Sequence, residues 1–245
     1  MTGASSGIGG AIARALREAG VRVAGGARRR ERLETEIALE LDVTEPASCE
    51  RFVAEAVAAL GGLDVLVNNA GLALGRDPFD LSTEEDEEVV LETNVRGLVR
   101  MTRLCLPHFS GGPGRDGGHI VNLGSVAGMQ AYPNGALYVT SKFAVHGFTQ
   151  ALREDLLGRP IRLTNVAPGL VETDFSRVRF RGDEEQARAV YADVALGGPM
   201  RPEDVADCVL FALTRPPHVN VDEIVVKALA QSSGGRILRE PGPQP

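Results

Sequence analysis

Tryptophan is absent from this chain of 245 residues, and there are only three tyrosines, eight phenylalanines, four histidines and three cysteines. A hydrophobic core must therefore be built mainly from alanine, valine and leucine. Cys49, Cys105 and Cys208 are odd in number, far apart and without metal-ligand spacing, which indicates free thiols in a reducing compartment. The four histidines are scattered, so no metal site is expected.

The chain also lacks an excess of positive charge and a long apolar run. Its formal net charge of −7 argues against a nucleic-acid partner, because phosphate binding needs a basic field. Every apolar run is shorter than the about 18 residues that a membrane helix requires, and no signal peptide is recognisable. We therefore expect a cytoplasmic protein without a membrane partner.

Apolar segments rich in β-formers alternate with helical patterns. One such pattern places Ile8, Ile12 and Leu16 on a single helical stripe. The alternation predicts an α/β fold, a Rossmann-like doubly wound parallel sheet flanked by helices, as a single domain over residues 1–239 with a disordered tail at 240–245. The expected strands lie at 21–27, 37–41, 64–68, 119–125, 161–168 and 219–226.

An acidic run, EEDEE, follows Ser82 and Thr83, either of which can cap a helix. Carboxylates in a first helical turn suit the helix dipole. We expect this run to be a solvated helix start with no further role.

The stretch TGASSGIG, residues 2–9, spaces Gly3, Gly7 and Gly9 as G-x-x-x-G-x-G at the start of a helix. Such glycines let the backbone approach a pyrophosphate, which the helix N-terminus then binds. No strand segment precedes this loop, and only about eight residues lie between Arg28 and the segment 37–41. We expect both shortfalls to reflect residues that are missing from this sequence.

The stretch YVTSK places Tyr138 and Lys142 four residues apart, on one face of a helix. A tyrosine has a pKa of about 10, and a nearby ammonium favours the phenolate and lowers that pKa. Ser125 ends a predicted strand, where side chains line the ligand crevice of a doubly wound sheet. Asn94 carries an amide within a predicted helix, and NNAG, residues 68–71, ends another strand.

In order and spacing, these motifs and the pair Pro168–Gly169 resemble the short-chain dehydrogenase/reductase superfamily over nearly the whole chain. The resemblance implies that Tyr138 is the general acid/base, that Lys142 lowers its pKa and binds the nicotinamide ribose, that Ser125 bonds the substrate oxygen, and that Asn94 supports Lys142 through a water. It implies cofactor contacts for Gly3, Ser5, Ser6, Gly7, Ile8, Gly9, Arg28, Arg29, Asp42, Val43, Asn69, Ala70, Gly71, Tyr138, Lys142, Pro168, Gly169, Val171 and Thr173.

In the superfamily, the residue at the end of the second strand indicates which cofactor is used. Members that use NAD carry an acidic residue at the place where this chain has Ala27, followed by Arg28 and Arg29. Arginine pairs with a 2′-phosphate, whereas a carboxylate would repel it. The sequence therefore predicts NADP(H), with Asp42 and Val43 resembling the pair that flanks the adenine.

The loop LVETDFSRVRFRGDEEQA, with NNAGLALGRDP and QSSGGR, resembles the NADP-dependent 3-hydroxy acid dehydrogenases, also called serine dehydrogenases. That resemblance implies a small-molecule substrate such as serine, 3-hydroxyisobutyrate or 3-hydroxypropionate, or its semialdehyde, and a homotetramer or homodimer. Arg177, Arg179 and Arg181 could bind the carboxylate, and an extended loop would point all three the same way; salt bridges are the alternative. A reductase of bulkier ketone or 3-oxoacyl substrates and a non-catalytic NADP-binding sensor are the rival functions.

Overall fold

A computed structural model describes residues 1–109 and 117–240, so the predicted tail lies outside the described residues apart from Glu240. All strand pairings are parallel. One sheet pairs β1 with β2, and a second has the order β3-β4-β5-β6. The strands are β1 (Ala24–Ala27), β2 (Ile37–Glu40), β3 (Val65–Asn68), β4 (Gly118–Leu123), β5 (Ile161–Pro168) and β6 (Glu223–Val226).

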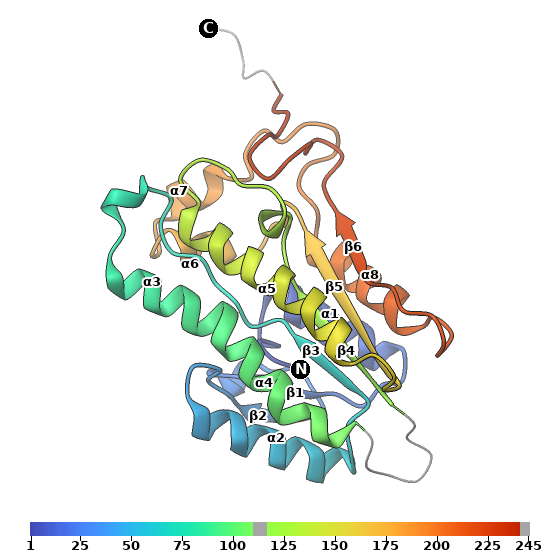
Figure 1. The fold of residues 1–245 in the computed structure, drawn as a ribbon. Coiled ribbons are helices and arrows are strands. Elements are labelled where there is room, and N and C mark those ends of the chain that lie inside the picture. Colours follow the sequence, from blue (N-terminus) through green and yellow to red (C-terminus); the bar gives the residue numbers. More distant parts are fainter. Residues whose placement is uncertain (110–116, 241–245) are drawn as a thin grey trace, which may run out of the picture.

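Helices cover both faces of the sheet, as the sequence predicted (Figure 1). α1 (Gly7–Glu18) and α8 (Pro202–Leu213) pack together on one face, around a core that includes Ile12, Val205 and Val209. A second core, around Phe52, Met101 and Leu152, packs against the other face. The helices that supply this second core are α2 (Pro46–Leu60), α4 (Leu98–Cys105) and α5 (Ala136–Asp155).

Residues 1–3 lie between β1 and β3 and join the two sheets. The Gly26 amide donates to the Met1 carbonyl at 2.9 Å, and the Thr2 amide donates to the Val67 carbonyl at 3.0 Å. Between β1 and β2 the described chain has only a 3₁₀ turn, Arg30–Arg32, and no α-helix. Within the described residues, only the Thr2–Gly26 bridge precedes the glycine loop, and no α-helix connects β1 to β2.

The predicted strand segments overlap the six strands, but the first strand begins at Ala24 rather than at residue 21, and the fourth ends at Leu123, two residues before Ser125. The last strand begins at Glu223 rather than at residue 219. The reason is Asn220, whose side chain accepts a hydrogen bond from the Leu163 amide at 2.7 Å and donates to the Leu163 carbonyl at 2.9 Å. At this end of β5 the Asn220 side chain therefore takes the place of backbone hydrogen bonds from a neighbouring strand.

The acidic run begins α3 (Glu84–Leu91), with Thr83 as the cap that accepts a hydrogen bond from the Asp86 amide. The expectation that this run is only a solvated helix start is wrong for Asp86. Its carboxylate is buried and accepts two hydrogen bonds from Arg181, at 2.6 and 2.7 Å. α3 continues through a π-helical segment, Glu92–Gly97, into α4.

Cys49 and Cys105 are buried free thiols, and Cys208 is a half-buried one. Among residues 1–109 and 117–240, no three His, Cys, Asp or Glu side chains gather so as to hold a metal ion. No helix of the described chain is long and apolar enough to cross a membrane.

Candidate active site

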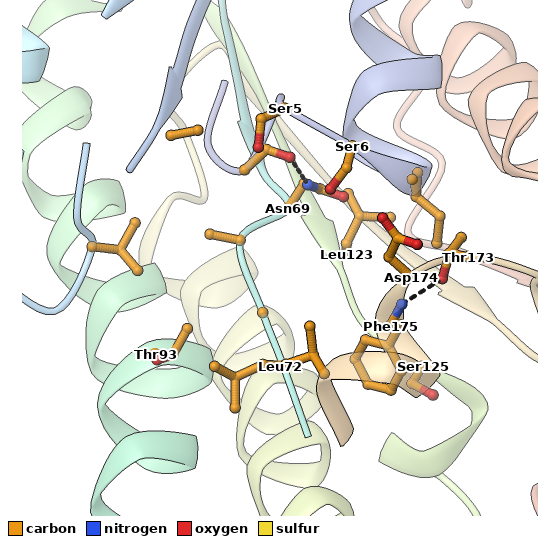
Figure 2. A pocket seen from close by; sticks show the side chains of 18 of the residues that line it. Ser5, Ser6, Asn69, Leu72, Thr93, Leu123, Ser125, Thr173, Asp174 and Phe175 are labelled. Carbon is orange, nitrogen blue, oxygen red and sulfur yellow. Dashed lines mark hydrogen bonds between the residues drawn. The ribbon is translucent and has the colours of Figure 1, made fainter. Parts of the chain in front are cut away.

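A pocket of about 340 Å³ opens at the carboxyl ends of the strands. Figure 2 shows Ser5 and Ser6 along one side of it, and Thr173 and Phe175 along another. Its lining includes Ser125 and every predicted cofactor contact except Gly9. The other lining residues were not predicted as contacts, although Ala27 lies at the cofactor-selecting position and some of the rest lie in the segments that indicated the substrate. They are Ala27, Leu41, Thr44, Leu72, Thr93, Leu123, Gly124, Asp174, Phe175 and Val178.

The glycine loop forms a cradle that side chains would fill. Gly3 and Gly7 have φ values of 65° and 53°, in the left-handed region that favours glycine. Gly9 lies behind the loop, where a Cβ atom would stand 2.1 Å from the Gly3 carbonyl oxygen. Ser6, the N-cap of α1, makes no side-chain capping bond, so the first N–H groups of α1 remain available beside the pocket. This cradle fits the pyrophosphate of a dinucleotide.

The NNAG segment is bound directly to that cradle. The Asn69 side-chain amide donates to the Gly3 carbonyl at 2.9 Å, and the backbone amides of Asn69 and Ala70 donate to the Thr2 hydroxyl, each at 3.0 Å. β3 thereby holds the loop in place at the floor of the pocket.

Arg28 and Arg29 follow β1 and are exposed at one end of the pocket. Neither forms an ion pair with another described residue. Two cations whose guanidinium groups are not occupied by carboxylates suit a phosphate on the adenosine ribose. Their position at this end of the pocket is compatible with the prediction that Arg28 and Arg29 bind the 2′-phosphate of NADP.

At the other end of the pocket, Tyr138 on α5 lies beside Ser125. The Ser125 hydroxyl accepts a hydrogen bond from the Ala127 amide at 3.1 Å. Burial raises the pKa of the Tyr138 phenol and the nearby Tyr132 raises it further, whereas a hydrogen bond with Ser125 and the charge of Arg179 lower it. A substrate oxygen placed here would meet both hydroxyl groups.

Lys142 is buried one helical turn after Tyr138. Its Nζ atom donates to the Leu123 carbonyl at 2.8 Å and lies 5.8 Å from the centroid of the Tyr138 ring. Burial lowers the pKa of Lys142 to about 8. The charge of Arg179 also lowers the pKa of Tyr138. The effect of Lys142 on that pKa stays a prediction.

Asn94 is buried in the π-helical segment, and its amide is held on three sides. It donates to the Leu72 carbonyl at 2.8 Å and to the Ser141 hydroxyl at 2.9 Å, and it accepts from the Leu72 amide at 2.8 Å. A Cβ atom on Gly71 would stand 3.2 Å from Asn94 Oδ1 and 3.7 Å from Lys142 Nζ. Both groups border the same small space, which suits the predicted water-mediated link between them; that link stays a prediction.

The three candidate arginines of the substrate loop have different environments. The loop is not extended, so the condition under which all three would point the same way is not met: residues Phe175–Arg179 form the short helix α6. Arg177 is exposed and lies 3.7 Å from Glu184. Arg181 is bound to Asp86. For these two residues, the alternative of salt bridges is the one that the structure shows.

Arg179 is half-buried and lies beside Tyr138, although it is not among the residues that line the pocket. Its Nε donates to the Gly75 carbonyl at 2.9 Å, and one terminal nitrogen donates to the Tyr132 hydroxyl at 3.1 Å. Its guanidinium carbon lies 5.8 Å from the centroid of the Tyr138 ring. No described carboxylate forms an ion pair with it. Tyr132 was missed in the sequence, although it is one of only three tyrosines and lies six residues before Tyr138.

One end of the pocket is a glycine cradle at the edge of a doubly wound sheet, and the other end holds a cluster of Tyr, Lys, Ser and Asn side chains. This combination defines an oxidoreductase that depends on a nicotinamide dinucleotide. The chain matches the family model described as short chain dehydrogenase over residues 1–184 and belongs to that family.

Individual relatives and solved structures show which members of the family this chain resembles. The NADP-dependent 3-hydroxy acid dehydrogenase YdfG of Salmonella typhi is 41% identical over 244 residues, covering 96% of both chains. The NADP-dependent 3-hydroxy acid dehydrogenase of Schizosaccharomyces pombe is 38% identical, covering 98% of this chain and 95% of its own. The closed form of a serine dehydrogenase complexed with NADP⁺ is 39% identical, superposes with a TM-score of 0.89 and covers 98% of both chains.

Proposed function

We propose that this protein transfers hydride between NADP(H) and a small 3-hydroxy acid, such as serine, 3-hydroxyisobutyrate or 3-hydroxypropionate, or the corresponding semialdehyde. The position of Arg179 carries this proposal. A half-buried guanidinium without an ion-pair partner in the described chain lies 5.8 Å from the Tyr138 ring. In a 3-hydroxy acid, one carbon separates the reacting carbon from the carboxylate, so Tyr138 and Arg179 can hold both groups at once.

The chain's own residues account for the proton transfer. Ser125 and Tyr138 receive the substrate's hydroxyl oxygen, and the Tyr138 phenolate takes its proton during oxidation. In reduction the phenol returns that proton to the developing alkoxide. Bound NADP(H) would supply the hydride acceptor for oxidation at the hydroxyl-bearing carbon and the hydride donor for the reverse reaction. Lys142 and the cradle formed by Gly3, Ser6 and Gly7 would hold the cofactor.

The proposal is tested by the growth of reduced-nicotinamide absorbance with a panel of substrates. We expect NADP-dependent oxidation of serine, 3-hydroxypropionate and 3-hydroxyisobutyrate. 1-Propanol, which lacks the carboxylate of 3-hydroxypropionate, should be oxidised at least about a hundredfold less efficiently, because it forgoes a charge-assisted pair with Arg179. Oxidation of a bulky secondary alcohol alone would favour a ketone or 3-oxoacyl reductase. Tight NADPH binding without any turnover would favour the sensor.

Cofactor choice gives a separate prediction. Replacing Arg28 and Arg29 together with alanine should weaken NADPH binding by roughly a hundredfold and leave NADH binding within about twofold, because only NADPH carries the 2′-phosphate. Isothermal titration with each nucleotide measures this difference. Arg30→Ala is the matched control, since that residue starts the 3₁₀ turn and does not line the pocket. Equal losses for NADPH and NADH would contradict the assignment.

A cytoplasmic location and assembly as a homotetramer or homodimer stay predictions from the sequence.

A further inference from the structure

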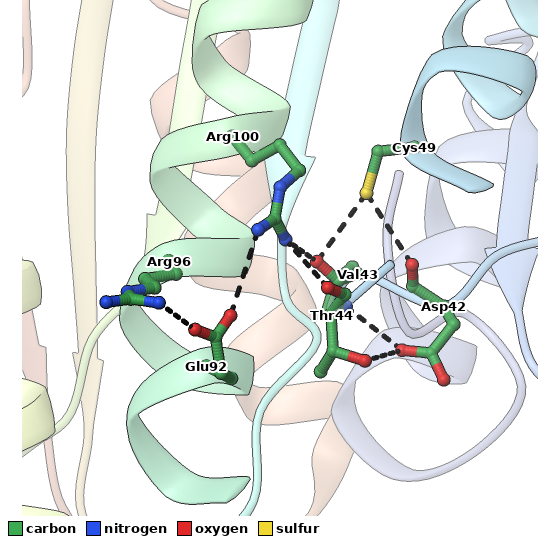
Figure 3. A network of polar contacts seen from close by, with 7 residues as sticks. All are labelled: Asp42, Val43, Thr44, Cys49, Glu92, Arg96 and Arg100. Carbon is green, nitrogen blue, oxygen red and sulfur yellow. Dashed lines mark hydrogen bonds and ion pairs between the residues drawn. The ribbon is translucent and has the colours of Figure 1, made fainter. Parts of the chain in front are cut away.

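Arg100, on α4, forms a polar network with the loop that follows β2 (Figure 3). It does not line the pocket, whereas Asp42, Val43 and Thr44 of that loop do. One terminal nitrogen of Arg100 donates to the Val43 carbonyl at 2.5 Å and to the Thr44 carbonyl at 3.2 Å. One cation therefore holds two consecutive carbonyl groups of the pocket wall from behind.

Glu92 fixes the direction of this guanidinium. Its carboxylate lies 3.7 Å from the other terminal nitrogen of Arg100, and both side chains are about one-fifth exposed. Glu92 also pairs with Arg96, but that arginine is 73% exposed and touches no part of the loop in Figure 3. Of the two arginines that pair with Glu92, Arg100 is therefore the one that links α4 to the loop at 42–44.

The other hydrogen bonds within residues 42–44 are either internal or come from α2. The Asp42 carboxylate accepts hydrogen bonds from the Thr44 amide at 3.0 Å and from the Thr44 hydroxyl at 2.7 Å. The Asp42 amide donates to Ser48 at 3.0 Å. On the other side, a Cβ atom on Gly97 would stand 2.9 Å from the Val43 Cβ atom, so the start of α4 packs directly against the loop. Arg100 adds the polar link at the same contact.

We propose that Arg100 is a positioning residue for the adenosine half of NADP, because it holds the Val43 and Thr44 carbonyls and so sets the distance between the loop at 42–44 and the pocket. This inference rests on the proposed cofactor. It differs from a direct cofactor contact, because the guanidinium faces the back of the loop. Loss of Arg100 should therefore affect adenosine binding and leave the chemistry at Tyr138 unchanged.

The test compares Arg100→Met with Arg96→Met, which removes the other arginine that pairs with Glu92. Binding of NADPH is followed by its fluorescence, and binding of 2′,5′-ADP, the adenosine fragment, by isothermal titration. We expect Arg100→Met to weaken both ligands by about tenfold, since the arginine makes charge-assisted bonds to two carbonyls. Arg96→Met should stay within about twofold of the unchanged protein, as an exposed pair contributes little.

Two further readouts separate positioning from general destabilisation. Arg100→Lys, which can still reach a carbonyl, should recover part of the affinity for 2′,5′-ADP. At saturating NADP the turnover of Arg100→Met should equal that of the unchanged protein, while the KM for NADP rises. Unchanged affinity for 2′,5′-ADP in Arg100→Met would overturn the inference, as would equal losses in Arg96→Met.

Glu92→Gln covers the case in which Arg100→Met does not fold. It keeps Arg100 but removes the charge that orients it, so we expect 2′,5′-ADP to bind more weakly than it does to Arg96→Met; equal affinities would overturn the inference. If the unchanged protein binds neither NADPH nor 2′,5′-ADP, the proposed cofactor is wrong. Binding to the unchanged protein with no effect of either variant would contradict only the role of Arg100.

Discussion

Replacing Tyr138 with phenylalanine should lower turnover by roughly 10²- to 10⁴-fold, the range that a positioned acid/base contributes. The substitution removes the hydroxyl that exchanges a proton with the substrate and keeps the ring that packs edge-on against Phe175 at a centroid distance of 5.5 Å. NADPH binding, followed by fluorescence, should change by less than about threefold, because the proton transfer and not the binding is lost.

Tyr132→Phe is the control for this experiment. It removes the hydroxyl that accepts a hydrogen bond from Arg179 but leaves the Tyr138 phenol in place. Its kcat should stay within about threefold of the unchanged protein, since no proton passes through Tyr132. Near-normal turnover in Tyr138→Phe would exclude Tyr138 as the acid/base.

Arg179→Met should raise the KM for 3-hydroxypropionate by about a hundredfold and leave that for 1-propanol unchanged, because only the acid loses a charged partner. A second effect follows from the charge of Arg179, which lowers the pKa of Tyr138. Without this cation the pKa of the phenol rises. Oxidation requires the phenolate, so the pH at which the oxidation rate reaches half of its maximum should move upward.

The two neighbouring arginines supply matched controls. Arg177→Met removes an exposed pair with Glu184 and should change neither KM nor the pH profile. Arg181→Met leaves the buried Asp86 carboxylate without its cation, so it should lower the melting temperature while the KM stays near that of the unchanged protein. Equal KM effects for all three substitutions would mean that Arg179 has no special role.

The sequence predicted the strands and the ends of the pocket because their signals are local. Apolar β-rich segments mark the strands, and the spacing of Gly3, Gly7 and Gly9 marks the cradle. The four-residue interval between Tyr138 and Lys142 places both side chains on one face of α5. Each of these patterns lies within one element, so chain geometry alone constrains it.

The choice among the three loop arginines could not be made in the same way. Arg179 donates hydrogen bonds to Gly75 and Tyr132, which are 104 and 47 residues away in the sequence. Arg181 binds Asp86, which is 95 residues away. Such pairs depend on the tertiary arrangement of loops that no local pattern describes. The helix α6 has only five residues, too few for periodicity to distinguish it from an extended segment.

The π-helical segment Glu92–Gly97 limits how this chain can change in length. α3 and α4 form one rod in Figure 1, but the wider turn between them shifts the phase of one helix relative to the other. Deleting a single residue from this segment would permit a regular α-helix and rotate α3 by about 100° relative to α4. Asp86 could then no longer face Arg181 while Arg100 faces the loop at 42–44. A substitution at the exposed Arg96 leaves both contacts in place, whereas the deletion would break one of them.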